Sequence, residues 1–205
     1  MRIIISLIIL FLSINKAFAD APNIVIFGDS LSAGYGIEIK ESWSSLLQSR
    51  LKEQGYIYEV INASISGETT EGGATRIDSI LKNFSPDLLI LELGGNDGLR
   101  GFPPERIKKN LEKIIIKTKS SGAEIVLLGI RIPTNYGTRY SKEFENVFRN
   151  ISYQFKINWI EFFMKDIAFN DDLLQEDRIH PNTDAQPILL NNAWPIIKDT
   201  LEKVE

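Results

Sequence analysis

The sequence predicts an α/β fold in which a parallel sheet lies between two layers of helices. From residue 23 onward, short apolar segments alternate with segments whose apolar residues recur at helical spacing. The most apolar segment, DLLILELGG at residues 87–95, is typical of a central parallel strand that is covered on both faces. Strands that alternate with helices pair in parallel through right-handed crossovers, so we expect a three-layer α/β/α sandwich.

Five strands and five longer helices are expected in chain order. The predicted strands are NIVIFGDS, YIYEVINAS, DLLILELGG, AEIVLLGIRIP and INWIEFF, which begin at residues 23, 56, 87, 123 and 157. The predicted helices cover residues 42–55, 71–84, 103–120 and 141–155, and the chain from about Asp184. Ser42 and Gly55 are candidate caps of the first helix. Pro195 is expected to interrupt or kink the last one.

The first nineteen residues, MRIIISLIILFLSINKAFA, predict a cleaved secretory signal. Arg2 precedes an apolar run from Ile3 to Leu12, and the segment ends in Ala17-Phe18-Ala19, the small-x-small pattern that signal peptidase accepts. The run is short for a membrane span, which makes an uncleaved anchor the weaker alternative. No cysteine follows, so a lipid anchor is excluded. We expect an exported protein with one mature domain at residues 20–205.

The composition excludes several classes of function. The chain has 23 basic and 27 acidic residues, and removal of Arg2 and Lys16 with the signal takes the formal net charge from −4 to −6. A mildly acidic protein is a poor candidate for binding nucleic acid or an anionic membrane through bulk charge. With no cysteine and one histidine, thiolate catalysis, disulfides and zinc sites built from several cysteines or histidines are excluded.

Residues with potential chemistry follow the first three predicted strands. Ligands bind at the carboxyl ends of the strands in sheets of this kind. The first strand ends in Gly28-Asp29-Ser30, which puts Ser30 at the start of a helix, where free N–H groups favour a negative charge. Gly67 follows the second strand and can present its N–H without a side chain in the way. Asn96 follows the third strand and has a short amide that can donate to a developing anion.

Each of these residues also has a purely structural explanation. Ser30 can cap a helix, Gly67 can belong to a flexible loop, and Asn-Asp-Gly at residue 96 is a common turn composition. The segment is not a G-x-S-x-G nucleophile elbow, because Ser32 replaces the second glycine, and it matches neither a phosphate loop nor a dinucleotide fingerprint. What favours a shared site is that all three residues lie on one edge of the sheet.

The single histidine, His180, lies in the segment QEDRIHPNTDAQP. Asp177 precedes it by three residues, and in a turn its carboxylate can accept from one ring nitrogen while the other faces a site. Such a pair fixes the tautomer and stabilises the imidazolium. Pro181 restricts His180 to extended or turn geometry, so we expect a loop. The alternative is a surface histidine before a C-terminal helix, with Asp177 only a solvated charge.

Together, four blocks resemble those of the SGNH (GDSL) hydrolases, in order and over essentially the whole mature chain. The blocks are Gly28-Asp29-Ser30-Leu31, Gly67, Gly95-Asn96-Asp97 and Asp177-x-x-His180-Pro181. The longer stretches NASISGET, ELGGNDGLRGF, IRIPTNYGTRY and IHPNTDAQP are similar to the periplasmic bacterial branch of multifunctional thioesterases, lysophospholipases and arylesterases. The resemblance implies a flavodoxin-like sandwich whose five-stranded parallel sheet has the order 2-1-3-4-5, and a periplasmic location.

The resemblance also implies a role for each matched residue. Ser30 would be the nucleophile, His180 the general base and then the acid, and Asp177 the group that orients His180. The oxyanion hole would consist of the backbone N–H groups of Ser30 and Gly67 and the Asn96 side chain. Substrate contacts would come from the neighbours of the nucleophile and from a loop that borders the acyl groove in the relatives, at Asp29, Leu31, Arg131, Ile132 and Pro133.

The implied reaction is hydrolysis of acyl esters and thioesters through an acyl-enzyme, without a metal or an organic cofactor. Candidate substrates are acyl-CoA and other thioesters, lysophospholipids and aryl esters. We expect a monomer that acts on small molecules, binds no nucleic acid and keeps no stable membrane anchor after signal cleavage. Two alternatives stay open at this point: a carbohydrate-ester deacetylase with the same triad, and a non-catalytic periplasmic binding module, because fold alone does not determine function.

Overall fold

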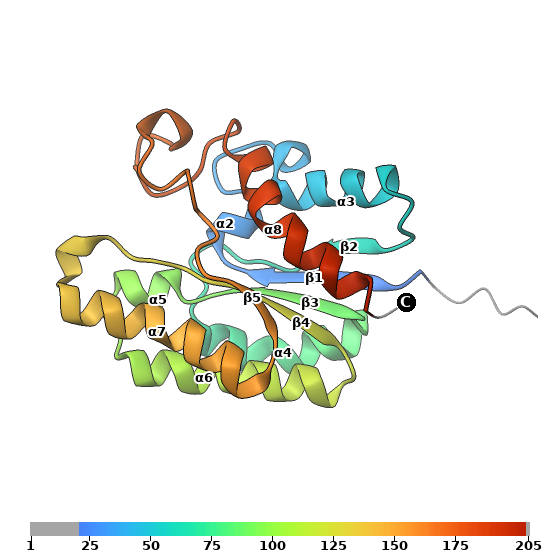
Figure 1. The fold of residues 1–205 in the computed structure, drawn as a ribbon, viewed down its shortest axis with the longest axis horizontal. Coiled ribbons are helices and arrows are strands. Elements are labelled where there is room, and N and C mark those ends of the chain that lie inside the picture. The colour runs from blue at the N-terminus through green and yellow to red at the C-terminus, as the bar shows by residue number, and fades with distance from the viewer. Residues whose placement is uncertain (1–20, 204–205) are drawn as a thin grey trace, which may run out of the picture.

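A five-stranded parallel sheet forms the centre of the structure, a computed structural model that describes residues 21–203 (Figure 1). The strand order is β2-β1-β3-β4-β5, and every neighbouring pair is parallel. The strands are β1 (Asn23–Gly28), β2 (Glu59–Asn62), β3 (Leu88–Glu92), β4 (Glu124–Leu128) and β5 (Asn158–Ile160). The predicted fold class and strand order are confirmed. The predicted signal segment, residues 1–19, lies outside the described residues.

Helices cover both faces of the sheet, as Figure 1 shows. One face carries α3 (Trp43–Glu53) and α8 (Gln186–Leu201). The other face carries α4 (Thr70–Phe84), α6 (Pro104–Ser120) and α7 (Thr138–Phe155). Shorter elements join them: α2 (Ser30–Ala33), α5 (Gly95–Leu99) and the 3-10 turns Ile39–Glu41, Thr134–Tyr136 and Asp171–Leu173.

Most predicted helices are close to their observed bounds, and the differences have local causes. Ser42 caps α3 by accepting from the Ser45 N–H, as predicted, and Gly55 follows the helix with a φ of +83°. Of the two outcomes predicted at Pro195, an interruption is wrong, since α8 continues through this residue to Leu201, and a kink stays a prediction. The predicted strands are too long, as at β4, where the buried Ile130 and Ile132 continue the apolar run beyond the paired residues.

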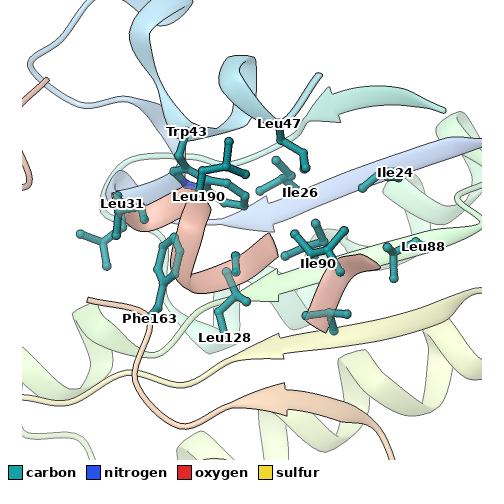
Figure 2. Packing of buried hydrophobic residues seen from close by; sticks show 14 of the residues in the cluster. Ile24, Ile26, Leu31, Trp43, Leu47, Leu88, Ile90, Leu128, Phe163 and Leu190 are labelled. Carbon is teal, nitrogen blue, oxygen red and sulfur yellow. The ribbon is translucent and has the colours of Figure 1, made fainter. Parts of the chain in front are cut away.

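The side chains of each strand alternate between two apolar layers, as the two-residue period of a strand requires. Ile24 and Ile26 of β1 pack with α3 and α8, whereas Val25 and Phe27 pack with α4 and α6. Figure 2 shows the first layer, in which Trp43 and Leu47 of α3 meet Leu190 of α8 and Phe163 over the sheet. Each fully buried side chain of this kind contributes about 1.5–3 kcal/mol to folding.

The sheet brings two strand ends together where the candidate site lies. Gly28, the last residue of β1, is paired in register with Glu92, the last residue of β3. The short helices α2 and α5 start just beyond these ends, at the same edge of the sheet in Figure 1. None of the helices between residues 21 and 203 combines the length and the hydropathy that a membrane span requires.

Candidate active site

The nucleophile candidate, Ser30, is the first residue of α2 and follows β1 by two positions. The helix cap is Asp29, not Ser30: its Oδ1 accepts from the Leu31 N–H at 3.1 Å. The Ser30 hydroxyl instead lies 2.9 Å from Nε2 of His180, a residue 150 positions later in the chain. Because Asp29 satisfies the helix end, the Ser30 side chain is left available for chemistry.

His180 lies between Ser30 and Asp177. Its Nδ1 is 2.6 Å from Oδ2 of Asp177, and the other Asp177 oxygen accepts from the backbone N–H groups of Ile179 and His180 at 2.9 and 3.0 Å. Partial burial tends to raise the pKa of Asp177, but these N–H groups and the His180 ring outweigh it and lower the pKa to about 2. Asp177 therefore stays ionised and favours the tautomer of His180 that has its proton on Nδ1.

The loop that carries His180 is fixed by contacts that the sequence analysis did not identify. Leu174 and Pro181 form an antiparallel bridge, and the Gln175 N–H donates to the His180 carbonyl at 2.8 Å. The Gln175 side chain donates to the carbonyls of Tyr35 and Pro181 at 2.8 and 3.0 Å. The Tyr35 ring lies 4.4 Å from the imidazole, centroid to centroid. Gln175 thus joins the histidine loop to the segment that follows the nucleophile helix.

The predicted oxyanion donors have hydrogens that are free for another acceptor. Within residues 21–203, neither the Ser30 nor the Gly67 N–H donates to another protein group. Gly67 has a φ of +80°, which favours glycine, although a Cβ would meet nothing within 4 Å. Asn96 Nδ2 donates one hydrogen to Asp29 Oδ2 at 3.0 Å, which leaves the second hydrogen of that nitrogen for another acceptor.

A buried network ties the start of α4 to α5, and one exposed contact reaches the Gly67 loop. Asp97 accepts from the Thr70 N–H at 2.9 Å and from the Thr70 hydroxyl at 2.6 Å, and Asn110 donates to that hydroxyl at 3.1 Å. Arg100 donates to the Gly67 carbonyl at 3.4 Å. Burial raises the pKa of Asp97, and the bonds from Thr70 oppose the rise. Asp97 thereby connects the start of α4 to α5, the helix that carries Asn96.

Asp29 is buried, and both of its carboxyl oxygens accept hydrogen bonds from protein groups. Its side chain is 2% exposed, and its two oxygens are taken by Leu31 and Asn96. Burial raises the pKa of Asp29 to about 6, against these hydrogen bonds. The structure shows a supporting contact between this carboxyl group and Asn96, and the expected substrate contact through Asp29 stays a prediction.

The other expected substrate contacts stay predictions. Leu31 and Ile132 are 9% and 6% exposed and belong to the two apolar layers. Arg131 is engaged by Glu161, at 3.0 Å, and by Glu145, at 3.6 Å. Pro133 is exposed.

Comparison with known proteins decides the family. Residues 26–186 match the model of the GDSL-like lipase/acylhydrolase family. This chain belongs to that family. Esterase TesA of Pseudomonas aeruginosa is 43% identical over 89% of this chain and 91% of its own length. The thioesterase 1/protease 1/lysophospholipase L1 of Escherichia coli is 40% identical over 83% of this chain and 81% of its own length. The resemblance drawn from the four motif blocks is confirmed.

Solved structures of family members have the same fold. The crystal structure of TesA matches with a TM-score of 0.85 and 42% identity, over 86% of this chain and 98% of that one. The psychrotrophic esterase EstA from Pseudoalteromonas, in a structure described as inhibited by monoethylphosphonate, matches with a TM-score of 0.84 and 43% identity, over 88% and 98% of the two chains. The protein is an ester hydrolase, as predicted.

Proposed function

We propose that the protein hydrolyses acyl esters and thioesters through a covalent acyl-enzyme on Ser30. The observation that carries this proposal is the series of two short contacts, 2.9 Å from Ser30 Oγ to His180 Nε2 and 2.6 Å from His180 Nδ1 to Asp177. A serine whose hydroxyl meets an oriented base has the arrangement that nucleophilic catalysis requires. A binding module needs no such base, so this contact disfavours the non-catalytic alternative.

Acylation begins when His180 Nε2 takes the Ser30 proton as Oγ attacks the acyl carbonyl. Negative charge then develops on the carbonyl oxygen, which accepts from the N–H groups of Ser30 and Gly67 and from Asn96. These donors are held before the reaction by α2, by the Gly67 loop and by Asp29, so little reorganisation is needed. Asp177 stabilises the imidazolium without taking its proton.

Collapse of the intermediate breaks the bond to the leaving alcohol or thiol, which receives the proton from His180 Nε2. Water then attacks the acyl-Ser30 carbonyl while His180 accepts its proton. The second collapse breaks the bond to Ser30 Oγ, which recovers its proton from His180, and the free acid leaves. No proton or electron is left over, and no cofactor enters the sequence.

The named relatives indicate the substrate range to test. They include an esterase, an arylesterase from Vibrio mimicus, 42% identical over 88% of this chain and 90% of its own length, and a thioesterase/lysophospholipase. We propose aryl esters, acyl thioesters and lysophospholipids as substrates, a periplasmic location after removal of the signal, and a monomeric enzyme. Preference for long acyl chains over acetyl groups separates this range from the carbohydrate-ester deacetylase.

Steady-state hydrolysis tests the proposal. The wild-type chain is assayed on p-nitrophenyl esters of increasing acyl length, on a long-chain acyl thioester and on an acetylated sugar, beside Ser30→Ala. Ser79→Ala, at an exposed serine of α4, is the matched control. Ser30→Ala should lose about 10⁴-fold or more of kcat. Hydrolysis by Ser30→Ala at the wild-type rate would overturn the proposed nucleophile, and activity on acetylated sugar alone would favour the deacetylase.

A further inference from the structure

Glu92 is a buried acidic residue that the mechanism above does not use. It ends β3, a strand whose other residues are all apolar, and it has no solvent exposure. Its backbone is in register with Gly28, two positions before the nucleophile. An acidic side chain is rarely buried to this degree unless it is paired or has a specific role.

The Glu92 carboxyl group contacts the turn that carries the nucleophile on both sides of Ser30. Oε2 accepts from the Ser32 hydroxyl at 2.8 Å and from the Asp29 N–H at 3.3 Å. Ser30 lies between these two donors in the sequence. The Glu92 carboxyl group therefore joins the end of β3 to the residues on both sides of Ser30.

The backbone of β1 leaves space for this carboxyl group. A Cβ on Gly28 would lie 2.7 Å from Glu92 Oε2 and 2.9 Å from the Glu92 carbonyl oxygen, closer than real side chains approach. Glycine at position 28 thus has a packing reason, and its φ lies outside the positive region that favours glycine. The first residue of the Gly28-Asp29-Ser30-Leu31 block and the last residue of β3 fit each other.

The surroundings of Glu92 favour its uncharged form. Both hydrogen bonds reach the same oxygen, and Oε1 is buried with no partner among the described residues. The nearby Asp29 carboxyl has donors for both of its oxygens, from Leu31 and Asn96. If the pair carries one negative charge, Asp29 is the better place for it. A charge on Glu92 would lie on a carboxylate with one oxygen that has no hydrogen-bond donor. Burial and the charge of Asp29 both raise the pKa of Glu92 well above its usual value.

We propose that Glu92 is a positioning residue of the esterase, which supports the Asp29–Ser32 turn as a neutral carboxylic acid and leaves Asp29 as the anion that orients Asn96. The inference rests on the proposed role of Ser30. Glu92 itself touches no reacting atom. Its effect passes through the Ser32 hydroxyl and the Asp29 N–H to the nucleophile, and through Asp29 to the oxyanion donor.

The first test compares two substitutions that differ only in hydrogen bonding. Glu92→Gln keeps an oxygen for Ser32 and Asp29 and mimics a neutral acid, whereas Glu92→Leu keeps the volume and removes both bonds. Glu92→Leu should lower kcat for p-nitrophenyl esters about 10- to 100-fold with KM within about threefold, less than the loss of an oxyanion donor itself. Glu92→Gln should retain kcat within about threefold. Glu124→Gln, at an exposed position on β4, is the matched control.

The second test measures the protonation state of Glu92 and does not depend on enzyme activity. The infrared difference spectrum of wild type minus Glu92→Gln at neutral pH should contain the carbonyl stretch of a protonated carboxyl group. A carboxylate band in its place would overturn the proposal. So would a folded Glu92→Gln variant that loses as much kcat as Glu92→Leu, or a Glu92→Leu variant with wild-type kcat. If Glu92→Leu does not fold, Glu92→Gln and the infrared band decide.

The two proposals fail in different ways. A wild-type protein that hydrolyses none of the esters would contradict the proposed function, and the infrared band would still report whether Glu92 is neutral. An active wild type with a carboxylate band at Glu92 would contradict the positioning role and leave the triad intact.

Discussion

The two sides of the site use carboxyl groups in opposite ways. Asp177, in an exposed loop, has a side chain that is 38% exposed and a pKa lowered to about 2. Glu92, under the nucleophile turn, is fully buried and has a raised pKa. The difference follows from hydrogen bonding and solvent, not from residue type: Asp177 accepts from two backbone N–H groups and contacts the His180 ring, whereas Glu92 has one unpaired oxygen and an anionic neighbour. In the proposed mechanism, Asp177 supplies charge and Glu92 holds the turn that carries Ser30.

The two sides also differ in how they are held. The serine side starts from the ends of β1 and β3, in the middle of the sheet, and its geometry depends on the core. The histidine side is a loop held by a bridge, by Gln175 and by contact with Tyr35. Substitutions on the loop should therefore change catalysis with little effect on stability, and substitutions under the turn should change both.

Asp177→Asn should have the largest effect among the supporting residues. An amide at this position can present an N–H to His180 Nδ1 and favour the wrong tautomer, which costs about 10³- to 10⁴-fold in kcat/KM. Initial rates on a p-nitrophenyl ester measure it, with Asp184→Asn, an exposed position on the same loop, as the control. A loss below tenfold in a folded variant would show that the loop does not depend on the charge of Asp177.

Asn96→Ala should have the next largest effect, because it removes one donor to the developing oxyanion and leaves the triad in place. We expect kcat to fall about 10²- to 10³-fold, with a smaller change in KM. Asn150→Ala, on the exposed surface of α7, is the control. A change confined to KM would instead assign Asn96 to ground-state binding.

Gln175→Ala should have a moderate effect, because it removes two side-chain bonds that hold the His180 loop against Tyr35. Each such bond contributes about 1 kcal/mol, so kcat/KM should fall about 5- to 30-fold. The melting temperature should fall by only a few degrees, less than for substitutions under the nucleophile turn. Wild-type kcat/KM would mean that Leu174 and Pro181 hold the loop without Gln175.

The last predicted effect is on the free energy of unfolding, and its pH dependence has opposite signs on the two sides of the site. Glu92 has a raised pKa in the folded protein, so folding takes up a proton and the stability falls as pH rises above the pKa of the unfolded residue. Glu92→Gln should remove this cost and gain stability over wild type between pH 5 and 8, by at most about 1.4 kcal/mol per pH unit. Urea unfolding at both pH values measures it.

The lowered pKa of Asp177 gives the opposite pH dependence of stability. Its stabilising contribution is present above about pH 4 and disappears as pH falls toward 2, so Asp177→Asn should differ most from wild type above that range. A Glu92→Gln difference that shrinks toward high pH would contradict the contrast between the two carboxyl groups.

The sequence was sufficient to predict the features that depend on local pattern and strand topology. Alternation of strands and helices predicts the sheet, and the carboxyl ends of parallel strands bring Ser30 and Asn96 together. The strand ends were less predictable. Ile130 and Ile132 are as buried as β4 itself but lie beyond its pairing, because burial and strand pairing end at different residues.

The supporting contacts were not predictable from pattern, with one exception. Gln175 and Tyr35 are 140 residues apart, and nothing local connects them. The cap of α2 is Asp29, whose side chain accepts from the Leu31 N–H, whereas the sequence offered Ser30 as the possible cap. Glu92 is the exception. It is an acidic residue in DLLILELGG, in a strand whose remaining positions are all apolar, and this pattern indicates a buried polar group.

Covalent labelling is the most direct test of whether His180 activates Ser30 as a nucleophile. The wild-type protein is treated with a fluorophosphonate, and peptide mass spectrometry locates the adduct while residual ester hydrolysis is measured. We expect one phosphonyl group on the peptide that contains Ser30, loss of activity in proportion to labelling, no adduct in Ser30→Ala and much slower labelling in His180→Ala. Full activity after complete labelling of Ser30, or inactivation by an adduct on another residue, would contradict the account.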